Sequence, residues 1–204
     1  NPNASSNRET GRDVLARALS SELKLEVVHT QHRGHAAEIA RAAVADGAGL
    51  VIAHGGDGTV NEVVNGMLSE LPPGDSALPA LGVIPGGLAN VFARALGLPR
   101  DPVAATSALL QAVTSRRLRR IGLGKADDHW FTFNAGVGWD ADVVAAVARL
   151  RAEGREVSPT LYARTTLACY VRYMRRAPQV TVEVPYEDPV HGLHTAFISN
   201  TDPW

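Results

Sequence analysis

The stretch "VIAHGGDGTVNEVVNG", residues 51–66, decides the fold of this chain. An apolar run, typical of a strand buried on both faces, ends in a turn that contains Gly55, Gly56, Asp57 and Gly58. Thr59 and Glu62 have the spacing of a capping box, which predicts a helix that begins at Thr59. Apolar residues then recur along one face of that helix: Val60, Val63, Val64, Met67 and Leu68.

A glycine turn between a strand and a helix is suited to hold phosphate. The glycines place no side chain over backbone amides that lie at the positive end of the helix dipole. Asp57 would repel a phosphate unless Mg²⁺ or a hydroxyl donor lies between them. The spacing matches neither a P-loop nor a Rossmann fingerprint. From spacing alone the ligand stays open, and a tight turn with a good helix cap is the alternative.

Helical and strand patterns alternate over the first half of the chain. Strands are expected at 25–30, 49–54 and 80–84. Helices are expected at 9–23 and 35–47, from Thr59, from about Leu88, and at 102–113. This alternation predicts an α/β fold with a parallel sheet covered by helices on both faces.

After residue 116 strand patterns follow one another, within 116–126, 129–138, 179–186 and 194–199, and helices are expected at about 141–152 and 159–175. We therefore predict an α/β nucleotide-binding domain at 1–119 and the start of a β-rich second domain at 120–204. The chain opens on "NPNAS" and stops at "SNTDPW". We interpret it as part of a longer protein, with a first strand before residue 1.

The composition excludes several classes of protein. The net charge is −1, so no global field recruits nucleic acid. A single cysteine, Cys169, excludes an internal disulfide framework and fits a reducing compartment. No apolar run approaches the roughly 20 residues of a membrane span. The oligomeric state, monomer or homodimer, is left open.

Four stretches match segments of one enzyme family in order. "NPNAS" at 1–5 resembles an opening Asn-Pro turn, and "GGDGTVNEVVNG" at 55–66 resembles a nucleotide-binding motif. "VIPGGLANVFARALGLP" at 83–99 resembles a P-x-G-T-x-N-D-F-A segment, and "FNAGVGWDADVV" at 133–144 resembles the opening of a second domain. The family that these stretches resemble is the diacylglycerol kinase catalytic domain, which includes bacterial lipid kinases, sphingosine kinases and ceramide kinases. The resemblance covers essentially the whole chain.

The resemblance implies a cytoplasmic enzyme, peripheral at the inner membrane face, that uses ATP and Mg²⁺. It would transfer the γ-phosphoryl group to a lipid hydroxyl, on a diacylglycerol or a sphingosine-like base. Asp57 is the implied catalytic residue, whereas in many bacterial members the base lies in a motif near the C-terminus, so residues 1–204 alone are expected to be inactive. The implied ATP-binding residues are Asn1, Pro2, Asn3, Ala4, Ser5, Thr30, Gly55, Gly56, Asp57, Gly58, Thr59, Val60, Asn61, Glu62, Gly86, Gly87, Leu88 and Asn90.

Two positions depart from the family pattern. Leu88 stands where the family usually has Thr or Ser, so a hydroxyl contact to phosphate is lost. Val91 stands where bacterial members often have Asp. These departures keep a non-catalytic nucleotide-binding module open as an alternative. A kinase of the same superfamily that phosphorylates NAD or a sugar phosphate is the other alternative.

Two further patterns have a simple structural interpretation. His29, His32 and His35 span a strand end, a loop and a helix start, so their spacing does not imply one face, and we predict no metal site. The arginines within 116–120 and 171–176 are candidates for contact with anionic lipid headgroups. Such charges more often form a solvated face.

Overall fold

The computed structural model describes residues 9–69 and 78–201 of the chain. Two compact units can be distinguished. The first takes the described residues up to Phe133 together with Asn200 and Thr201, and the second is Asn134–Ser199. The domain boundary at 119/120 stays a prediction about the whole protein.

The first unit is an α/β layer structure. Its elements are α1 (Glu9–Ser20), α2 (His35–Ala45), β1 (Leu50–Gly55), α3 (Asp57–Met67), β2 (Ala80–Pro85), α4 (Val91–Ala95), α5 (Pro102–Thr114), β3 (Gly124–Ala126) and β4 (His129–Phe131). Strands β1 and β2 pair in parallel, from Leu50 opposite Ala80 to Gly55 opposite Pro85. Apolar side chains on both faces of these strands explain why helices cover both.

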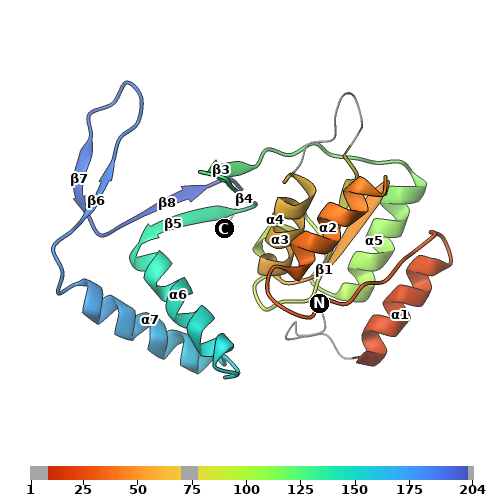
Figure 1. Ribbon diagram of the computed structural model, residues 1–204, viewed down its shortest axis with the longest axis horizontal. Helices are drawn as coiled ribbons and strands as arrows, with labels where there is room; N and C mark the ends of the chain where they lie inside the picture. The colour runs from red at the N-terminus through yellow and green to blue at the C-terminus, as the bar shows by residue number, and fades with distance from the viewer. Residues whose placement is uncertain (1–8, 70–77, 202–204) are drawn as a thin grey trace. The chain divides into compact units, whose positions relative to one another are not determined.

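Helices lie on both sides of the parallel pair (Figure 1). On one side, Ala40 of α2, Val60 of α3 and Phe92 of α4 pack in a core with Ala53 and Val83 of the strands. On the other side, a second core contains these residues of α1, the strands and α5: Leu15, Leu19, Ile52, Ile84, Leu109 and Leu110. The predicted fold class, an α/β parallel-sheet domain followed by a β-rich part, is confirmed.

The predicted strand at 25–30 was wrong. No ladder hydrogen bond joins this segment to another strand within the described residues. Val27 and His29 of this segment line a cavity of about 160 Å³ together with Val51 and Ala53 of β1. A strand is held by hydrogen bonds to a neighbour, and β-propensity alone does not supply them.

Two predicted helix starts were also wrong. Helix α3 begins at Asp57, with Gly56 as its N-cap, so Thr59 and Glu62 do not form a capping box. Helix α4 begins at Val91 because Asn90, the N-cap, has a left-handed backbone (φ 47°) that ends the preceding turn. In neither helix does the side chain of the N-cap residue itself accept a hydrogen bond from the first turn.

The second unit is built from antiparallel strands and two helices. Its elements are β5 (Asn134–Gly138), α6 (Trp139–Ala152), α7 (Pro159–Tyr173), β6 (Val180–Val182), β7 (Val190–Leu193) and β8 (Thr195–Ser199). Strand β5 pairs with β8, and β6 pairs with β7. Val143 and Val147 of α6 pack against Cys169 of α7. This confirms the predicted change from parallel to antiparallel pairing.

Helix α6 begins with two acids, as expected for residues that favour the helix dipole. Asp140 and Asp142 both lie in its first turn. Burial raises the pKa of Asp140 above its ordinary value of 3.8. In the described part of the chain, none of the helices combines the length and the apolar composition needed to cross a bilayer.

Candidate functional site

The carboxyl ends of β1 and β2 lie side by side and define the candidate site. Gly55 and Pro85 are the last residue pair of the parallel ladder. Beyond them the Gly86 amide donates a hydrogen bond to the Gly55 carbonyl, at 2.9 Å. Strand β1 then passes through Gly56 into α3, and β2 passes through the turn at 86–90 into α4. In open α/β sheets, ligands bind at this edge, outside the carboxyl ends of the strands.

The two glycine turns touch each other through their backbones. A Cβ atom placed on Gly87 would lie 2.5 Å from the Cα atom of Gly56. A Cβ atom placed on Gly56 would lie 3.1 Å from the Cα atom of Gly87. Contact distances this short leave no room for a side chain at Gly87 without backbone movement. The two turns therefore act as one surface, with main-chain atoms from both strand ends.

Asn90 fixes the second turn. Its Oδ1 atom accepts a hydrogen bond from the Gly87 amide at 2.9 Å, and its Nδ2 atom donates to the Gly87 carbonyl at 2.7 Å. The side-chain amide therefore satisfies both main-chain groups of Gly87. Left-handed backbone is tolerated by Asn better than by most residues. Asn90, implied by resemblance as an ATP contact, shapes the loop in this structure.

Asp57 joins the first turn to the second. Its Oδ1 atom accepts a hydrogen bond from the Phe92 amide in the first turn of α4, at 3.0 Å. The side chain is half-buried, and Phe92 is a buried core residue. Within the described part of the chain, no hydrogen bond reaches the second carboxylate oxygen of Asp57, Oδ2. Asp57 thus has a structural contact that its position in the sequence did not reveal.

Gly58 faces open space. A Cβ atom added there would meet none of the described residues within 4 Å, and Gly58 does not have a positive φ. Gly56 is also extended rather than left-handed, with φ −85° and ψ −178°. Positive φ is therefore not the reason for glycine at either position. At Gly56 the reason is the close approach of Gly87, whereas at Gly58 none of the described residues fills the space that a side chain would take.

The amides at the start of α3 complete this surface. Gly56 has no side chain with which to cap the helix, and the amides of Asp57 and Gly58 have no acceptor within it. These amides lie at the positive end of the α3 dipole. Backbone amides in such a position bind phosphate oxygens.

The other candidate residues have different surroundings. Thr30 and Thr59 line the 160 Å³ cavity beside β1. Val60 is 2% exposed and donates its amide to the Gly56 carbonyl, so it serves the core and the helix. Asn61 and Glu62 are half-buried, and Leu88 is 81% exposed. Residues 1–5, from Asn1 to Ser5, lie outside the described residues.

The histidines are closer together than their spacing suggested. The rings of His32 and His35 stack with centroids 4.7 Å apart. With Glu38 they offer possible ligand atoms within 4.8 Å of one another. The Nδ1 atom of His35, however, accepts a hydrogen bond from the Gln31 amide, so the neutral ring has its proton on Nε2. In this tautomer neither ring nitrogen of His35 has a lone pair free for a metal ion.

Sequence reasoning missed the role of Asn65. Its Oδ1 atom accepts from the Trp130 amide, and its Nδ2 atom donates to the Trp130 carbonyl, both at 2.9 Å. This pair of bonds attaches β4 to α3. Residue 66 is glycine for a different reason: a Cβ atom there would collide with the carbonyl of Ala37, on α2. The sequence signal for these contacts was the run "NEVVNG", in which Asn and Gly lower helix propensity and so indicate a role other than helix formation.

Comparison with known proteins identifies the family. The model of the diacylglycerol kinase catalytic domain matches residues 1–126, which include both glycine turns and the elements of the first unit from α1 to β3. The chain therefore belongs to the diacylglycerol kinase catalytic domain family.

Individual relatives agree with this assignment. A diacylglycerol kinase of Bacillus subtilis is 38% identical over 140 residues, which are 67% of this chain and 44% of the relative. A probable lipid kinase YegS-like of Chromohalobacter salexigens is 36% identical over 132 residues, or 65% of this chain and 40% of the relative. The chain thus spans less than half the length of these relatives.

Solved structures share the fold. A putative diacylglycerol kinase from Bacillus anthracis matches 68% of this chain and 48% of its own, with a TM-score of 0.56 and 28% identity. Another structure of a putative diacylglycerol kinase from this species covers all of this chain, and 64% of its own, with a TM-score of 0.69. Its identity is 23%, so this match concerns the fold alone.

Proposed function

We propose that the whole protein is an ATP-dependent lipid kinase. It transfers the γ-phosphoryl group of ATP to a hydroxyl of a lipid such as a diacylglycerol or a sphingosine-like base. The observation that supports this most is the paired glycine surface at the ends of β1 and β2, in a chain of the diacylglycerol kinase family.

The phosphate groups of ATP fit the start of α3. No described residue occupies the space beside Gly58, and a Cβ atom there would enter the position proposed for a phosphate oxygen. The amides of Asp57 and Gly58 offer hydrogen bonds, and Gly56 and Gly87 leave the adjoining backbone uncovered. The loss of a hydroxyl at Leu88 matters less on this surface, because the contacts come from the main chain. Thr30 and Thr59 are proposed to adjoin it.

Asp57 is the residue that we propose takes part in phosphoryl transfer. Oδ1 is occupied by the Phe92 amide, which orients the carboxylate and leaves Oδ2 for Mg²⁺, water or the acceptor hydroxyl. Oxygen ligands of this kind suit Mg²⁺, which supplies charge neutralisation to the transferred phosphoryl group when it is bound. Phosphoryl transfer depends mainly on positioning and charge, so a fixed carboxylate beside main-chain donors is appropriate chemistry.

The reaction breaks the bond between the γ-phosphorus and the β–γ bridging oxygen and forms one to the lipid hydroxyl oxygen. The hydroxyl proton leaves to a carboxylate or to water, and ADP departs. Because the acceptor lies in a bilayer, we place the protein at the inner membrane surface as a peripheral enzyme. Residues 1–119 are proposed as the nucleotide-binding domain.

Phosphoryl transfer to a panel of acceptors tests this function. The whole protein is incubated with radiolabelled ATP and Mg²⁺ and offered diacylglycerol, a sphingosine-like base, NAD or a sugar phosphate. Label in a lipid product is expected. Label in NAD or in a sugar phosphate would assign the protein to another branch of the superfamily. ATP binding without transfer to any acceptor would instead indicate a non-catalytic module.

A further inference from the structure

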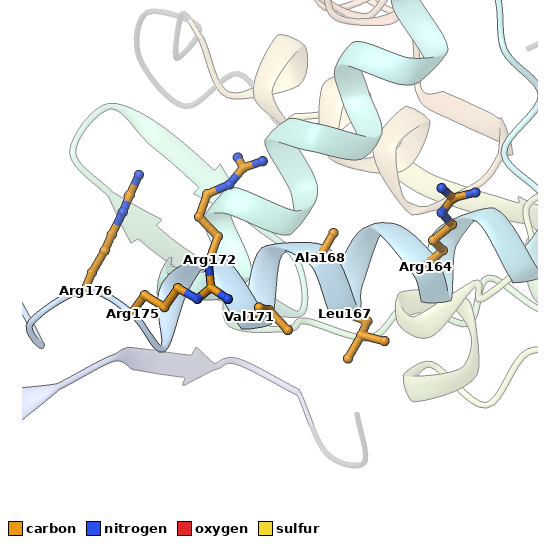
Figure 2. A pocket seen from close by; sticks show the side chains of 7 residues that line it. All are labelled: Arg164, Leu167, Ala168, Val171, Arg172, Arg175 and Arg176. Carbon is orange, nitrogen blue, oxygen red and sulfur yellow. The ribbon is translucent and has the colours of Figure 1, made fainter.

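Helix α7 and the turn that follows it present a continuous face of arginine and apolar side chains. We define this basic face by its residues: Arg164, Leu167, Ala168, Val171, Arg172, Arg175 and Arg176. The first five recur at intervals of three and four residues, which places them on one side of α7, and Arg175 and Arg176 follow directly after its C-cap, Met174. They line an open depression of about 690 Å³ (Figure 2).

The opposite side of α7 is the one that packs. Cys169 is buried against Val143 and Val147 of α6. On the basic face, by contrast, Leu167 is 62% and Val171 is 45% exposed, and all four arginines are exposed. Met174, at the C-cap of the helix, is 52% exposed as well. The apolar residues of this face therefore do not belong to the core of the second unit.

The charge on this face is unbalanced. The sequence contains four arginines and no acidic residue between Glu156 and Glu183. Arg176 has a long ion pair, 3.9 Å, with Asp142 of α6, and both side chains are at least half-exposed. Among the residues that the structure describes, Arg164, Arg172 and Arg175 have no ion pair. The whole chain has a net charge of −1, so this positive charge is a local feature.

We propose that the basic face of α7 docks the protein on a bilayer that contains anionic phospholipids. In a helix that lies in a membrane interface, apolar side chains enter the headgroup and acyl boundary while cationic ones flank them. Figure 2 shows Leu167 and Val171 in the middle of the face, with Arg164 toward one end and Arg172, Arg175 and Arg176 toward the other. Long arginine side chains keep their charged ends among phosphates while their methylenes cover apolar surface.

The composition of the face favours a bilayer over the other occupants. A second copy of this chain would place the same arginines opposite one another in a two-fold interface, which is repulsive. A soluble anion would satisfy the arginines and leave Leu167 and Val171 in water. A bilayer satisfies both groups at once, since its surface potential attracts arginine and its interior accepts apolar side chains.

This inference rests on the proposed function only in that a lipid acceptor requires a membrane surface, and it can be tested separately. The whole protein is mixed with sedimenting vesicles of phosphatidylcholine, with and without phosphatidylglycerol, and the bound fraction is measured. Arg172→Gln with Arg175→Gln is the test variant, and Arg149→Gln with Arg151→Gln is the control. The control removes equal charge from exposed positions in the last turn of α6.

The test variant should bind the anionic vesicles about 30-fold more weakly, the fold-change that corresponds to about 1 kcal/mol per arginine. The control variant should bind like the original protein. Leu167→Gln should weaken binding and leave its salt dependence unchanged. Equal loss in the test and control pairs would overturn the proposal, because it would show a dependence on net charge alone. Unchanged binding in the test pair would overturn it too, and would indicate that another surface or another part of the protein covers this face.

Lipid phosphorylation in neutral detergent micelles separates this proposal from the proposed function. There the test variant should turn over as fast as the original protein, because no anionic surface is involved. If the original protein binds anionic vesicles through α7 but phosphorylates no lipid in micelles, the proposed function fails and the docking surface stands.

Discussion

Replacing Asp57 separates its structural contact from its chemical one. Asp57→Ala removes the acceptor of the Phe92 amide at the start of α4. A hydrogen bond to a charged group contributes about 1.5–3 kcal/mol, and the half-buried position of Asp57 places it at the lower end. The free energy of unfolding should therefore fall by about 1.5 kcal/mol, which corresponds to a melting temperature about 3–6 °C lower in a domain of this size.

Asp57→Asn is the matched variant. Its side-chain oxygen can still accept from the Phe92 amide, so it should lose less than about 1 kcal/mol of stability, chiefly because a neutral acceptor is weaker and the dipole interaction is lost. Both variants lack the carboxylate charge. We therefore expect both to lose lipid phosphorylation, although only the alanine variant is clearly destabilised.

Two assays on the whole protein check this pair. Urea unfolding gives the free energies, and transfer from radiolabelled ATP to lipid gives turnover. If Asp57→Ala were as stable as the original protein, the hydrogen bond to Phe92 would not contribute as reasoned. If Asp57→Asn kept its turnover, the carboxylate charge would have no part in the transfer, and the proposed role of Asp57 would be wrong.

Three other substitutions each test one feature of the structure with its own measurement. Gly58→Ala should keep or slightly raise stability, by up to about 1 kcal/mol, because its Cβ meets nothing and alanine favours helix; calorimetric titration should nevertheless show weaker ATP binding, and unchanged affinity would remove Gly58 from the phosphate site. Asn65→Ala leaves both main-chain groups of Trp130 without their partner, so urea unfolding should show a loss of about 1–3 kcal/mol, and no loss would contradict the link between α3 and β4. Because the pKa of Asp140 is raised in the folded protein, its ionisation opposes folding above pH 3.8. Asp140→Asn should therefore be more stable than the original protein at neutral pH and lose that advantage as the pH falls below 3.8. A variant less stable than the original protein at neutral pH would contradict this.

The α/β pattern could be predicted because its cause is local. The apolar run before Gly55 and the helix period after it specify a buried strand and a covering helix without reference to the rest of the chain. The strand predicted at 25–30 has the same local character, but strand formation depends on a neighbour, which the segment itself does not encode.

In the candidate site, too, the local features could be predicted and the long-range contacts could not. Gly56 and Gly58 were both predicted to face phosphate, and the sequence contains no sign that Gly56 approaches Gly87, 31 positions away, or that Asp57 reaches Phe92, 35 positions away. These contacts depend on the parallel register of β1 and β2, which brings the two turns together. The hydrogen bond of Asp57 to Phe92 could not be predicted, because long-range hydrogen bonds leave no mark on local spacing.

Hydrogen–deuterium exchange of the whole protein, with and without a non-hydrolysable ATP analogue and Mg²⁺, tests the central claim that the paired glycine turns hold the phosphates. We predict slower exchange of the amides at 56–58 and 86–88 when the analogue is bound, because phosphate oxygens accept hydrogen bonds from amides at the start of α3 and exclude water from the adjoining backbone. Saturating binding of the analogue with unchanged exchange at both turns would contradict the account and place the nucleotide elsewhere.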